Sequence, residues 1–414
     1  MRRLPTLLCI LTPTLALAEP IKPDIHFATA MYGVLSKKPG NLFFSPASIQ
    51  LAFSMAAGGA RGETAAQMQS VLGSDGTIHE KNAAQLRRWD TLANPAVDPN
   101  RAAQSPEMQR YDESELARKR ILLNVVNRLW AQKGKALRAD YTTLLKDKYR
   151  APVAQVDFEH APEPSRVEIN KWVSTETKKK IPELLAKKTI SEATRLVLVN
   201  AIYFKATWAQ QFTKSSTTEQ PFHAPGHDVR APLMTNIDHF QLARIDGGQL
   251  LELPYGAGDL AMDVILPTAK DGLPAVEKAL AEGALHGWLA GLKSARVEVS
   301  LPRWKTSSAM ELADTLKAMG AKLPFESRGA DFSGIDDTHE LFLSAVIHQA
   351  VVDVNEDGTE AAAATAVIMM QTEAALPLER PIVFRADHPF VYLIRDTSTG
   401  AVLFAGRLSD PKAN

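Results

Sequence analysis

Glu356-Asp-Gly-Thr-Glu-Ala-Ala-Ala-Ala-Thr-Ala-Val-Ile-Met-Met-Gln-Thr372 is the most informative stretch of this 414-residue chain. It begins acidic, turns at a glycine, and carries no charge from Ala361 to Thr372. The first half of this uncharged run consists of very small side chains, so the segment can lie exposed as a loop and can equally be buried as a strand. We expect the function of the protein to follow from this double compatibility.

The stretch has two interpretations as secondary structure. Four consecutive alanines are strong helix formers, so it can form a surface helix capped by Thr359. Val367 and Ile368 instead favour a strand, and no 3.6-residue apolar stripe separates a wet face from a dry one. Side chains alternate between the faces of a strand, so one face would hold Thr359, Ala361, Ala363 and Thr365. All four are small and uncharged, and such a strand could enter between existing strands with few clashes.

The composition is that of an ordinary globular protein, with 45% hydrophobic and 23% charged residues, and it is sufficient for a sizeable core. The 47 Lys and Arg balance the 47 Asp and Glu, so no global field favours nucleic acid or an anionic membrane as a partner. We expect a monomer. Helices early in the chain and long strands later, with no dividing linker, predict a single α+β domain.

Residues 1–18 have the layout of a signal peptide, with two arginines before an apolar run and Ala-Leu-Ala at the end. The run is too short to span a membrane. The single cysteine, Cys9, lies inside it without the small residues that usually precede a lipidated cysteine. We therefore expect cleavage after Ala18 and a mature chain, residues 19–414, that is free of disulfides and is secreted or periplasmic in a bacterium.

Periodicity and end signals predict most of the elements. Ser45 as a cap and Pro46 at the first helical position begin a helix that is apolar all round and should be buried. The predicted helices are 47–57, one that opens at Glu63, 166–185, 273–281 and 310–319. The predicted strands are 40–45, 121–130, 196–204, 240–242, 250–254, 262–267, 296–302, 341–354, 390–394 and 402–404. Residues 74–119 are polar and rich in proline, and we expect much of this segment to be an irregular surface excursion.

No catalytic apparatus is recognisable. The glycine-rich Gly58–Thr64 lacks the lysine and the glycine spacing of a phosphate-binding loop. Neither Gly-x-Ser-x-Gly nor His-Glu-x-x-His occurs. The ten histidines lack metal-ligand spacing, and the mature chain would retain no cysteine ligand. We expect no enzymatic activity, no metal and no cofactor.

Four motifs in one order resemble the serpin family over essentially the whole mature length. They are Asn41-Leu-Phe-Phe-Ser-Pro-Ala-Ser-Ile49 with Gly59-Ala-Arg-Gly-Glu-Thr64, Asn200-Ala-Ile-Tyr-Phe-Lys-Ala-Thr-Trp208 with Phe212, Phe384-Arg-Ala-Asp-His-Pro-Phe390, and Phe404-Ala-Gly-Arg407. The resemblance implies three β-sheets, about nine helices and an exposed reactive-centre loop, here about 356–382. It also implies inhibition of a serine protease, which cleaves the loop, becomes acylated, and is carried to the far pole when the loop inserts into the central sheet as a new strand.

The resemblance assigns roles to individual residues, none of them catalytic. The hinge of the loop corresponds to Glu356, Gly358, Thr359, Glu360, Ala361, Ala362, Ala363, Ala364 and Thr365. A polar cluster beneath the central sheet, the shutter of the family, corresponds to Ser45, Ser48, Asn200 and His348. The breach, where the loop first enters the sheet, corresponds to Lys205 and Trp208.

The resemblance also places the reactive bond. Counting seventeen residues from Glu356, as in the family, puts it at Thr372–Glu373, and a small β-branched residue there suggests an elastase-like protease. The segment that follows looks a few residues longer than in typical members, so the cut can shift. The alternatives are Met369 and Met370, which would suit chymotrypsin-like or subtilisin-like enzymes, and Leu376. Arg380 could attract a trypsin-like enzyme but lies far down the loop.

Rival interpretations remain beside the inhibitor. A non-inhibitory serpin that acts as a binding or storage protein would share the fold, although bulky or charged hinge residues are frequent in such members. An exported hydrolase would need the catalytic constellation that is missing. Activation by a heparin-like polyanion would need a basic helix face, for which the candidates are Arg87-Arg88, 118–120 and 178–180, each of which is better interpreted as a solvated surface.

Overall fold

The computed structural model describes residues 25–74, 76–94, 105–109, 121–359 and 380–413. Several sequence predictions lie outside these ranges. They are the signal peptide 1–18, the hinge residues Glu360, Ala361, Ala362, Ala363, Ala364 and Thr365, and the reactive-bond candidates Met369, Met370, Thr372, Glu373 and Leu376.

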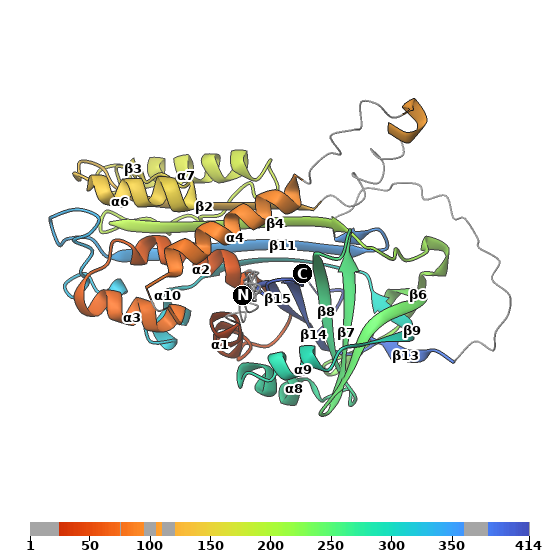
Figure 1. Cartoon of the computed structure of the whole chain (residues 1–414). Helices are drawn as coiled ribbons and strands as arrows, with labels where there is room; N and C mark the ends of the chain where they lie inside the picture. The colour runs from red at the N-terminus through yellow and green to blue at the C-terminus, as the bar shows by residue number, and fades with distance from the viewer. Residues whose placement is uncertain (1–24, 75, 95–104, 110–120, 360–379, 414) are drawn as a thin grey trace, which may run out of the picture.

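The strands form two hydrogen-bonded networks, which lie across one another in Figure 1. The first, called here the central sheet, has the order β10-β11-β12-β4-β2-β3. Its strands are β2 (Leu122–Gln132), β3 (Ala154–Val156), β4 (Leu196–Thr207), β10 (Trp304–Glu311), β11 (Leu343–Asn355) and β12 (Gly358–Thr359).

The second network has the order β1-β15-β14-β8-β7-β6-β9-β13, and β5 pairs with β6. Its strands are β1 (Leu42–Phe44), β5 (Thr218–Ala224), β6 (His227–Ile245), β7 (Gly248–Tyr255), β8 (Leu260–Pro267), β9 (Lys293–Pro302), β13 (Ile382–Arg385), β14 (Phe390–Asp396) and β15 (Val402–Leu408). The first half of the long β6 pairs with β5 and its last residues pair with β7. The network is thus two sheets joined through β6. Together with the central sheet they make three sheets, as predicted.

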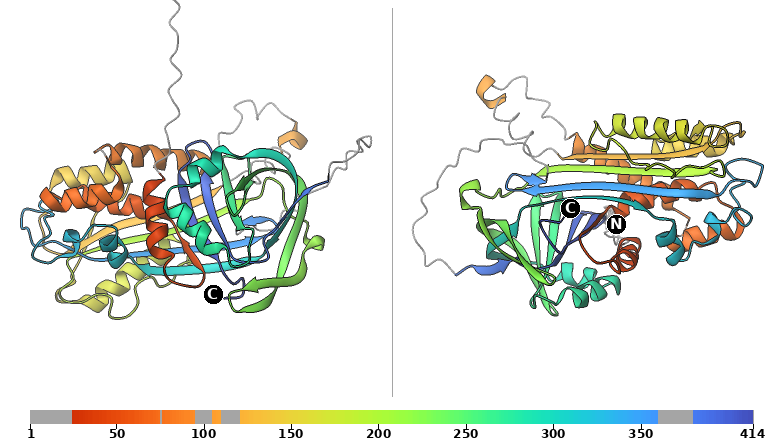
Figure 2. Two further views of the ribbon diagram at one scale, coloured as in Figure 1. Left: turned by 90° about the horizontal axis from the view of Figure 1, so that it is seen from below. Right: turned by 180° about the vertical axis from the view of Figure 1, so that it is seen from behind.

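Helices lie on both faces of the central sheet, and two of them, α8 and α9, pack instead against the second network (Figures 1 and 2). The helices are α1 (His26–Leu35), α2 (Pro46–Ala57), α3 (Gly62–Leu72), α4 (Ile78–Ala93), α6 (Ala139–Leu144), α7 (Pro162–Glu176), α8 (Leu273–Ala281), α9 (Leu285–Ala290) and α10 (Ala313–Ala318). No helix in the described ranges is long and apolar enough to cross a bilayer.

The core has two layers, one on each side of the central sheet. The inner layer joins α2 to β4 and β15, and α2 is buried all round as predicted, with Ile49, Phe53 and Met55 completely inaccessible. The outer layer lies under α7, where Ile169 and Val173 pack in one cluster with alternate residues of β4. Because β4 is covered on both faces, its near-continuous apolar sequence is explained.

The expected irregular excursion at 74–119 is wrong for residues 78–93, which form α4. Most of the helix is polar, and this obscured an amphipathic pattern. Ile78, Trp89 and Leu92 are buried on one side of it, and burial of such a stripe is enough to hold a helix that is polar elsewhere.

Two predicted helices have different limits. The helix expected at 166–185 begins earlier, at Pro162, and ends at Glu176. Lys178 and Lys179 adopt positive φ angles of 50° and 63°, which break the helix. The helix expected at 310–319 is α10, which begins only at Ala313, because the residues before it extend β10 along β11.

Candidate functional site: the seam of the central sheet

The central feature of the molecule is a parallel seam between β4 and β11. Both strands are long, and they pair from Leu196 opposite Leu343 to Tyr203 opposite Val351. Viewed from behind in Figure 2, β4 and β11 run side by side along the sheet. Parallel pairs are slightly less stable per residue than antiparallel ones, so we expect this seam to open more readily than the antiparallel pairs beside it.

At one end of the seam, β12 lies between the two strands. Thr359 pairs with Val354 of β11 and with Ala206 of β4, and Gly358 pairs with Asn355 and Thr207. Both pairings are antiparallel. Two residues of the predicted hinge, Gly358 and Thr359, are therefore already part of the sheet.

Glycine is required at the start of β12. Gly358 has φ +150°, and a Cβ atom there would lie 2.1 Å from the carbonyl oxygen of Ala206. No L side chain fits so close to a backbone oxygen. The glycine that marked a turn in the sequence therefore allows the chain to reverse from β11 and to approach β4.

Thr359 sits in an aromatic pocket and is completely buried. Its hydroxyl lies 2.7 Å from the hydroxyl of Tyr255. The Tyr255 ring stacks on Trp208 at 4.4 Å between centroids and meets Phe204 edge-on. A small polar residue fits this position, whereas a long charged one would be buried without a partner.

Trp208 holds the turn between β11 and β12, at the position predicted for the breach. Its indole Nε1 donates to the carbonyl oxygen of Asn355 at 2.9 Å, and its backbone N–H donates to Asp357 at 3.0 Å. Lys205 lies on β4, where it pairs with Leu122 of β2. It directly precedes Ala206, the residue that pairs with Thr359. Alternation along the strand turns Lys205 to the opposite face from Thr359, so the structure brings Trp208 to the hinge but not Lys205.

Glu356 anchors the base of the hinge, and its side chain is only 2% exposed. Its carboxylate accepts a hydrogen bond of 2.6 Å from the Thr217 hydroxyl and forms an ion pair with Arg303. Burial alone would raise the pKa of Glu356, but these hydrogen bonds outweigh it and hold the pKa below its usual value. The sequence analysis did not identify Thr217, Arg303 and Tyr255. These residues contact the hinge only through long-range tertiary contacts, and no local sequence motif identifies them.

The ion pair at the hinge base is testable by a double-mutant cycle. We expect Arg303→Ala and Glu356→Gln each to destabilise the native protein by about 1 kcal/mol, because Arg303 is half exposed. The double variant should lose less stability than the sum of the two single losses, because the coupling free energy of the pair is about 0.5–1 kcal/mol. Urea unfolding of the four proteins measures this. Strict additivity would mean that the pair contributes nothing.

The four predicted shutter residues meet beneath the middle of the seam. His348 is paired with Asn200 in the register of β11 and β4, and the His348 Nδ1 atom contacts the Asn200 Oδ1 atom. Ser48 Oγ donates to Asn200 Oδ1 at 3.0 Å, and the backbone N–H of Ser45 donates to His348 Nε2 at 3.1 Å. All four side chains are buried. Because Asn200 and His348 come from the two strands of the seam, any strand that enters here must part them.

The hydrogen bonds define the protonation state of His348. Its Nε2 atom accepts from a backbone N–H and so carries no proton, and its Nδ1–H donates to Asn200. Burial lowers the pKa of His348 to about 3. The ring is therefore neutral at physiological pH, and the cluster is a neutral hydrogen-bond network that joins α2 to both strands.

This burial predicts an acid dependence of stability. An unfolded histidine titrates near pH 6.5. Below that pH the unfolded chain therefore binds a proton, whereas His348 in the native protein stays neutral. Stability should therefore fall by about 1.4 kcal/mol per pH unit between about pH 6.5 and pH 3 from this residue alone. Urea unfolding of His348→Gln should show a lower stability at pH 7 and a shallower decline toward acid. His239→Gln, at an exposed position of β6, is the matched control. Parallel profiles of wild type and His348→Gln would contradict this account.

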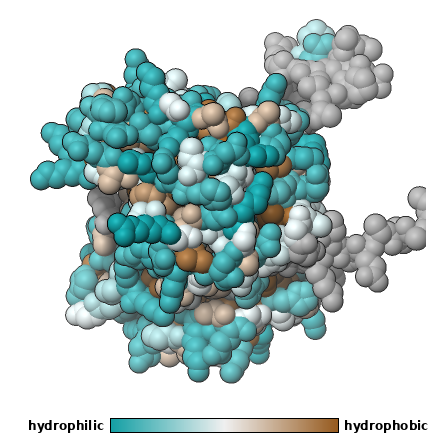
Figure 3. Space-filling view, turned by 90° about the vertical axis from the view of Figure 1, so that its left-hand side faces the viewer, coloured by the Kyte–Doolittle hydropathy of each residue, from teal (hydrophilic) through white to brown (hydrophobic). Residues whose placement is uncertain are grey.

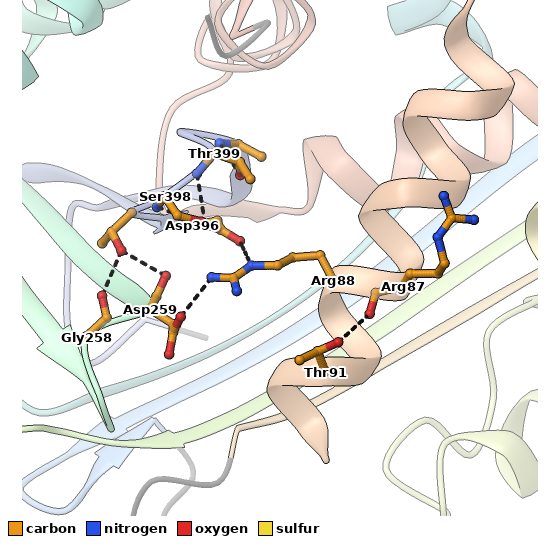
Figure 4. Close-up of polar contacts among 10 residues, drawn as sticks. Arg87, Arg88, Thr91, Gly258, Asp259, Asp396, Ser398 and Thr399 are labelled. Carbon is orange, nitrogen blue, oxygen red and sulfur yellow. Dashed lines mark hydrogen bonds and ion pairs between the residues drawn. The ribbon is translucent and has the colours of Figure 1, made fainter. Parts of the chain in front are cut away.

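Arg88 and Lys180, which belong to two of the three basic candidates, both have partners in the structure. Arg88 turns toward the second network, where it binds Asp259 at 2.8 Å and Asp396 at 3.1 Å, while Arg87 points to the other side of α4 (Figure 4). Lys180 lies 5.4 Å from the ring of Tyr203. Residues 118–120 are outside the described part of the chain. Within that part, no group of three or more His, Asp or Glu side chains is arranged to hold a metal ion.

Comparison with known proteins agrees with this geometry. The family model described as Serpin (serine protease inhibitor) matches residues 24–411. An uncharacterized serpin-like protein of Thermococcus kodakarensis is 37% identical over 387 residues, which cover 93% of this chain and 84% of that protein. The leukocyte elastase inhibitor of Xenopus laevis is 37% identical over 396 residues, covering 93% and 98%.

Solved structures are similar over the same length. Uncleaved ovalbumin superposes with a TM-score of 0.79 at 26% sequence identity, covering 95% of this chain and all of that one. The parallel seam, the hinge strand at its end and the polar cluster beneath it thus belong to a fold and a sequence pattern that span the whole described chain. The chain is a member of the serpin family.

Proposed function

We propose that this protein inhibits serine proteases by a single-use trap, in which residues from Thr359 onward insert between β4 and β11 after the protease has cleaved the loop. The observation that carries the proposal is β12, whose two residues pair with both strands at the end of the seam. A strand that has begun at this point needs only to continue in the same register.

Continuing the register of β12 makes the proposal specific. Thr359 lies between Val354 and Ala206, and each further residue advances one position against both strands. Thr365 would then lie between His348 and Asn200, which are themselves a register pair. Because directly paired residues share a face, Thr365 would enter the polar cluster, and its hydroxyl could replace the contact that the insertion separates.

The energetics favour insertion once the loop is cut. Residues 359–372 would span roughly 45 Å at about 3.3 Å per residue. The parallel seam would be replaced by two antiparallel ladders. A dozen or so added hydrogen bonds, at roughly 0.5–1.5 kcal/mol each, amount to a driving force on the order of 10 kcal/mol. Loss of one oxyanion-hole contact costs a protease about 3–4 kcal/mol of transition-state stabilisation. The driving force of insertion exceeds this energy, so it is sufficient to distort the active site of the protease.

Insertion in this direction would place the trapped protease at the far end of the seam from β12. Figure 3 views the molecule from that side, the left of Figure 1, and its surface is mostly hydrophilic with small scattered apolar areas. The described residues on this face form no large apolar patch for a partner. The complex would therefore be held by the covalent bond and by the inserted strand.

An elastase-like protease is the first target class to test. Thr372 is a small residue at the proposed bond, and the relatives named leukocyte elastase inhibitors include the human protein, which is 36% identical over 399 residues. Cleavage at Met369, Met370 or Leu376 would point to chymotrypsin-like or subtilisin-like enzymes instead. We further propose that the chain is exported as a monomer after removal of residues 1–18, so that the mature protein begins at Glu19.

The test is incubation of the mature protein with elastase, chymotrypsin, subtilisin and trypsin, followed by a denaturing gel and mass spectrometry. A denaturant-resistant band at the summed mass is the expected result for at least one enzyme, and the released peptide identifies the reactive bond. Loop cleavage by every enzyme without such a band, and without a gain in thermal stability, would favour a non-inhibitory binding protein. Intact mass of the exported protein tests the cleavage after Ala18.

A further inference from the structure

Two exposed apolar side chains lie close together on the sheet that contains β6, β9 and β13. Ile237 of β6 is 48% exposed, and Val383 of β13 is 60% exposed. Both pair directly with Glu298 of β9, one from each side. Because directly paired residues share a face of a sheet, the three side chains form one row across three strands. This set of Ile237, Glu298 and Val383 is called here the outer row.

The opposite face of the same strands holds the outer row in place. Phe384 and Val299 are paired with each other and are completely buried, and Ile382 packs against the core. Successive side chains of a strand point to opposite faces, so Val383 points outward because Ile382 and Phe384 point inward. The exposure of the row is therefore a consequence of the register of the sheet.

The outer row lies near both ends of the reactive-centre loop, because β9 is linked to each of them (Figure 1). At the start of the loop, Glu356 forms its ion pair with Arg303, the residue that directly follows β9. After the loop, Ile382 pairs with Val297 of β9. Glu298 is next to Val297, and the five residues from Glu298 to Arg303 span roughly 17 Å at about 3.3 Å per residue. The row thus lies beside the points at which residues 360–379 leave and rejoin the described fold.

A protease that cleaves the loop is wide enough to reach this row. A globular enzyme of about 240 residues has a radius of gyration of roughly 18 Å, which corresponds to a sphere about 45 Å across. Val383 follows Thr372 by eleven residues, which separates them by at most about 38 Å in a fully extended chain. The rim of the active-site cleft can therefore contact the row while the cleft holds the loop.

We propose that the outer row is a second contact surface for the target protease, used while the loop occupies the active site. This inference rests on the protease inhibition proposed above. The surface fits an apolar side chain at the rim of the protease cleft, packed against Ile237 and Val383, with a hydrogen-bond donor beside it for Glu298.

The surroundings of Glu298 assign the main part of the contact to the apolar side chains. The carboxylate of Glu298 forms no hydrogen bond or ion pair with another described residue, so it is available as an acceptor. Arg296 lies two residues away on the same face of β9, so the charge around the row is mixed. Net charge therefore does not select the partner, and the burial of apolar surface favours the contact.

The test is the second-order rate constant with which a protease attacks the loop of the mature protein, measured for the enzyme that reacts fastest with the wild type. We expect this rate constant to fall at least fivefold in Ile237→Ser combined with Val383→Ser, because about half of each apolar side chain is no longer buried in the complex. Glu298→Ala should lower it about two- to fivefold. The loop sequence is unchanged in these variants, so its contacts in the active site remain.

The matched control is Val167→Ser combined with Glu168→Gln, which removes an exposed valine and an exposed carboxylate from α7 and should react like wild type. Ile237→Ser alone should lower the rate constant at least twofold, and it avoids any disturbance of β13 next to the loop. The attack rate is defined whether the reaction ends in a trapped enzyme or in simple turnover. The denaturant-resistant band reports trapping separately, so a failure of inhibition is distinguishable from a failure of the outer row.

Three results would overturn the proposal. The first is an attack rate in both Ile237 variants equal to that of the wild type. The second is an equal loss of rate in the α7 control, which would assign the effect to a general change of the protein. The third is self-association of the uncut protein in sedimentation velocity that disappears when Ile237 and Val383 are replaced by serine, because the row would then be a contact between two copies of this chain.

Discussion

Thr359→Arg is expected to convert this protein from an inhibitor into a substrate. In the native molecule Thr359 is completely buried against Tyr255 and Trp208, and an arginine there would bury an unpaired charge. The two residues of β12 would leave the seam, and the strand that should follow them could not start. The acyl-enzyme would then hydrolyse before the protease is displaced.

The measured quantity is the number of inhibitor molecules consumed per protease inactivated. We expect it to rise at least tenfold in Thr359→Arg, while urea unfolding before cleavage changes by only about 1–3 kcal/mol, the cost of a few hydrogen bonds. Glu360→Arg is the matched control, since alternation places residue 360 on the opposite face and the wild type already carries a charge there. Full inhibition by Thr359→Arg would contradict insertion through this seam.

Cleavage of the loop is expected to raise the melting temperature by about 10–20 °C. The insertion releases on the order of 10 kcal/mol, and a chain of this length gains roughly 1–2 °C per kcal/mol. The fragment after the reactive bond contains β13, β14 and β15, and β14 lies between β8 and β15. It should therefore stay bound after cleavage, so that calorimetry measures one intact two-chain molecule.

The same cleavage in Thr359→Arg provides the control. Its loop should be cut at the same bond, but its melting temperature should stay near that of the uncut protein, because the strand cannot enter. A rise of equal size in both proteins would mean that the gain in stability comes from relief of loop strain and not from insertion between β4 and β11. An unchanged melting temperature in the wild type would mean that the sheet does not accept the strand.

Several elements could be predicted from the sequence because their signals are local. The cap at Ser45 is confirmed by the hydrogen bond from the Ser48 N–H to the Ser45 hydroxyl, and the helix after it is buried all round. The long apolar runs predicted β4 and β11 within a few residues. The error at α4 has the opposite cause: its composition is polar, and only contact with the core selects which few residues are buried.

By itself, the sequence indicated the segment for which we propose a change of structure. Small uncharged side chains after Gly358 make a loop that tolerates burial, and the family motifs named the polar residues of the shutter. The tertiary structure alone decided where the first residues of that segment, Gly358 and Thr359, lie. The parallel register of β4 and β11, the aromatic pocket of Tyr255 around Thr359, and the ion pair of Glu356 with Arg303 join residues that are between about 50 and 150 positions apart in the chain. Such contacts follow from the packing of the whole chain and leave no periodic trace in the sequence, because periodicity reports only the face that a residue presents within its own element.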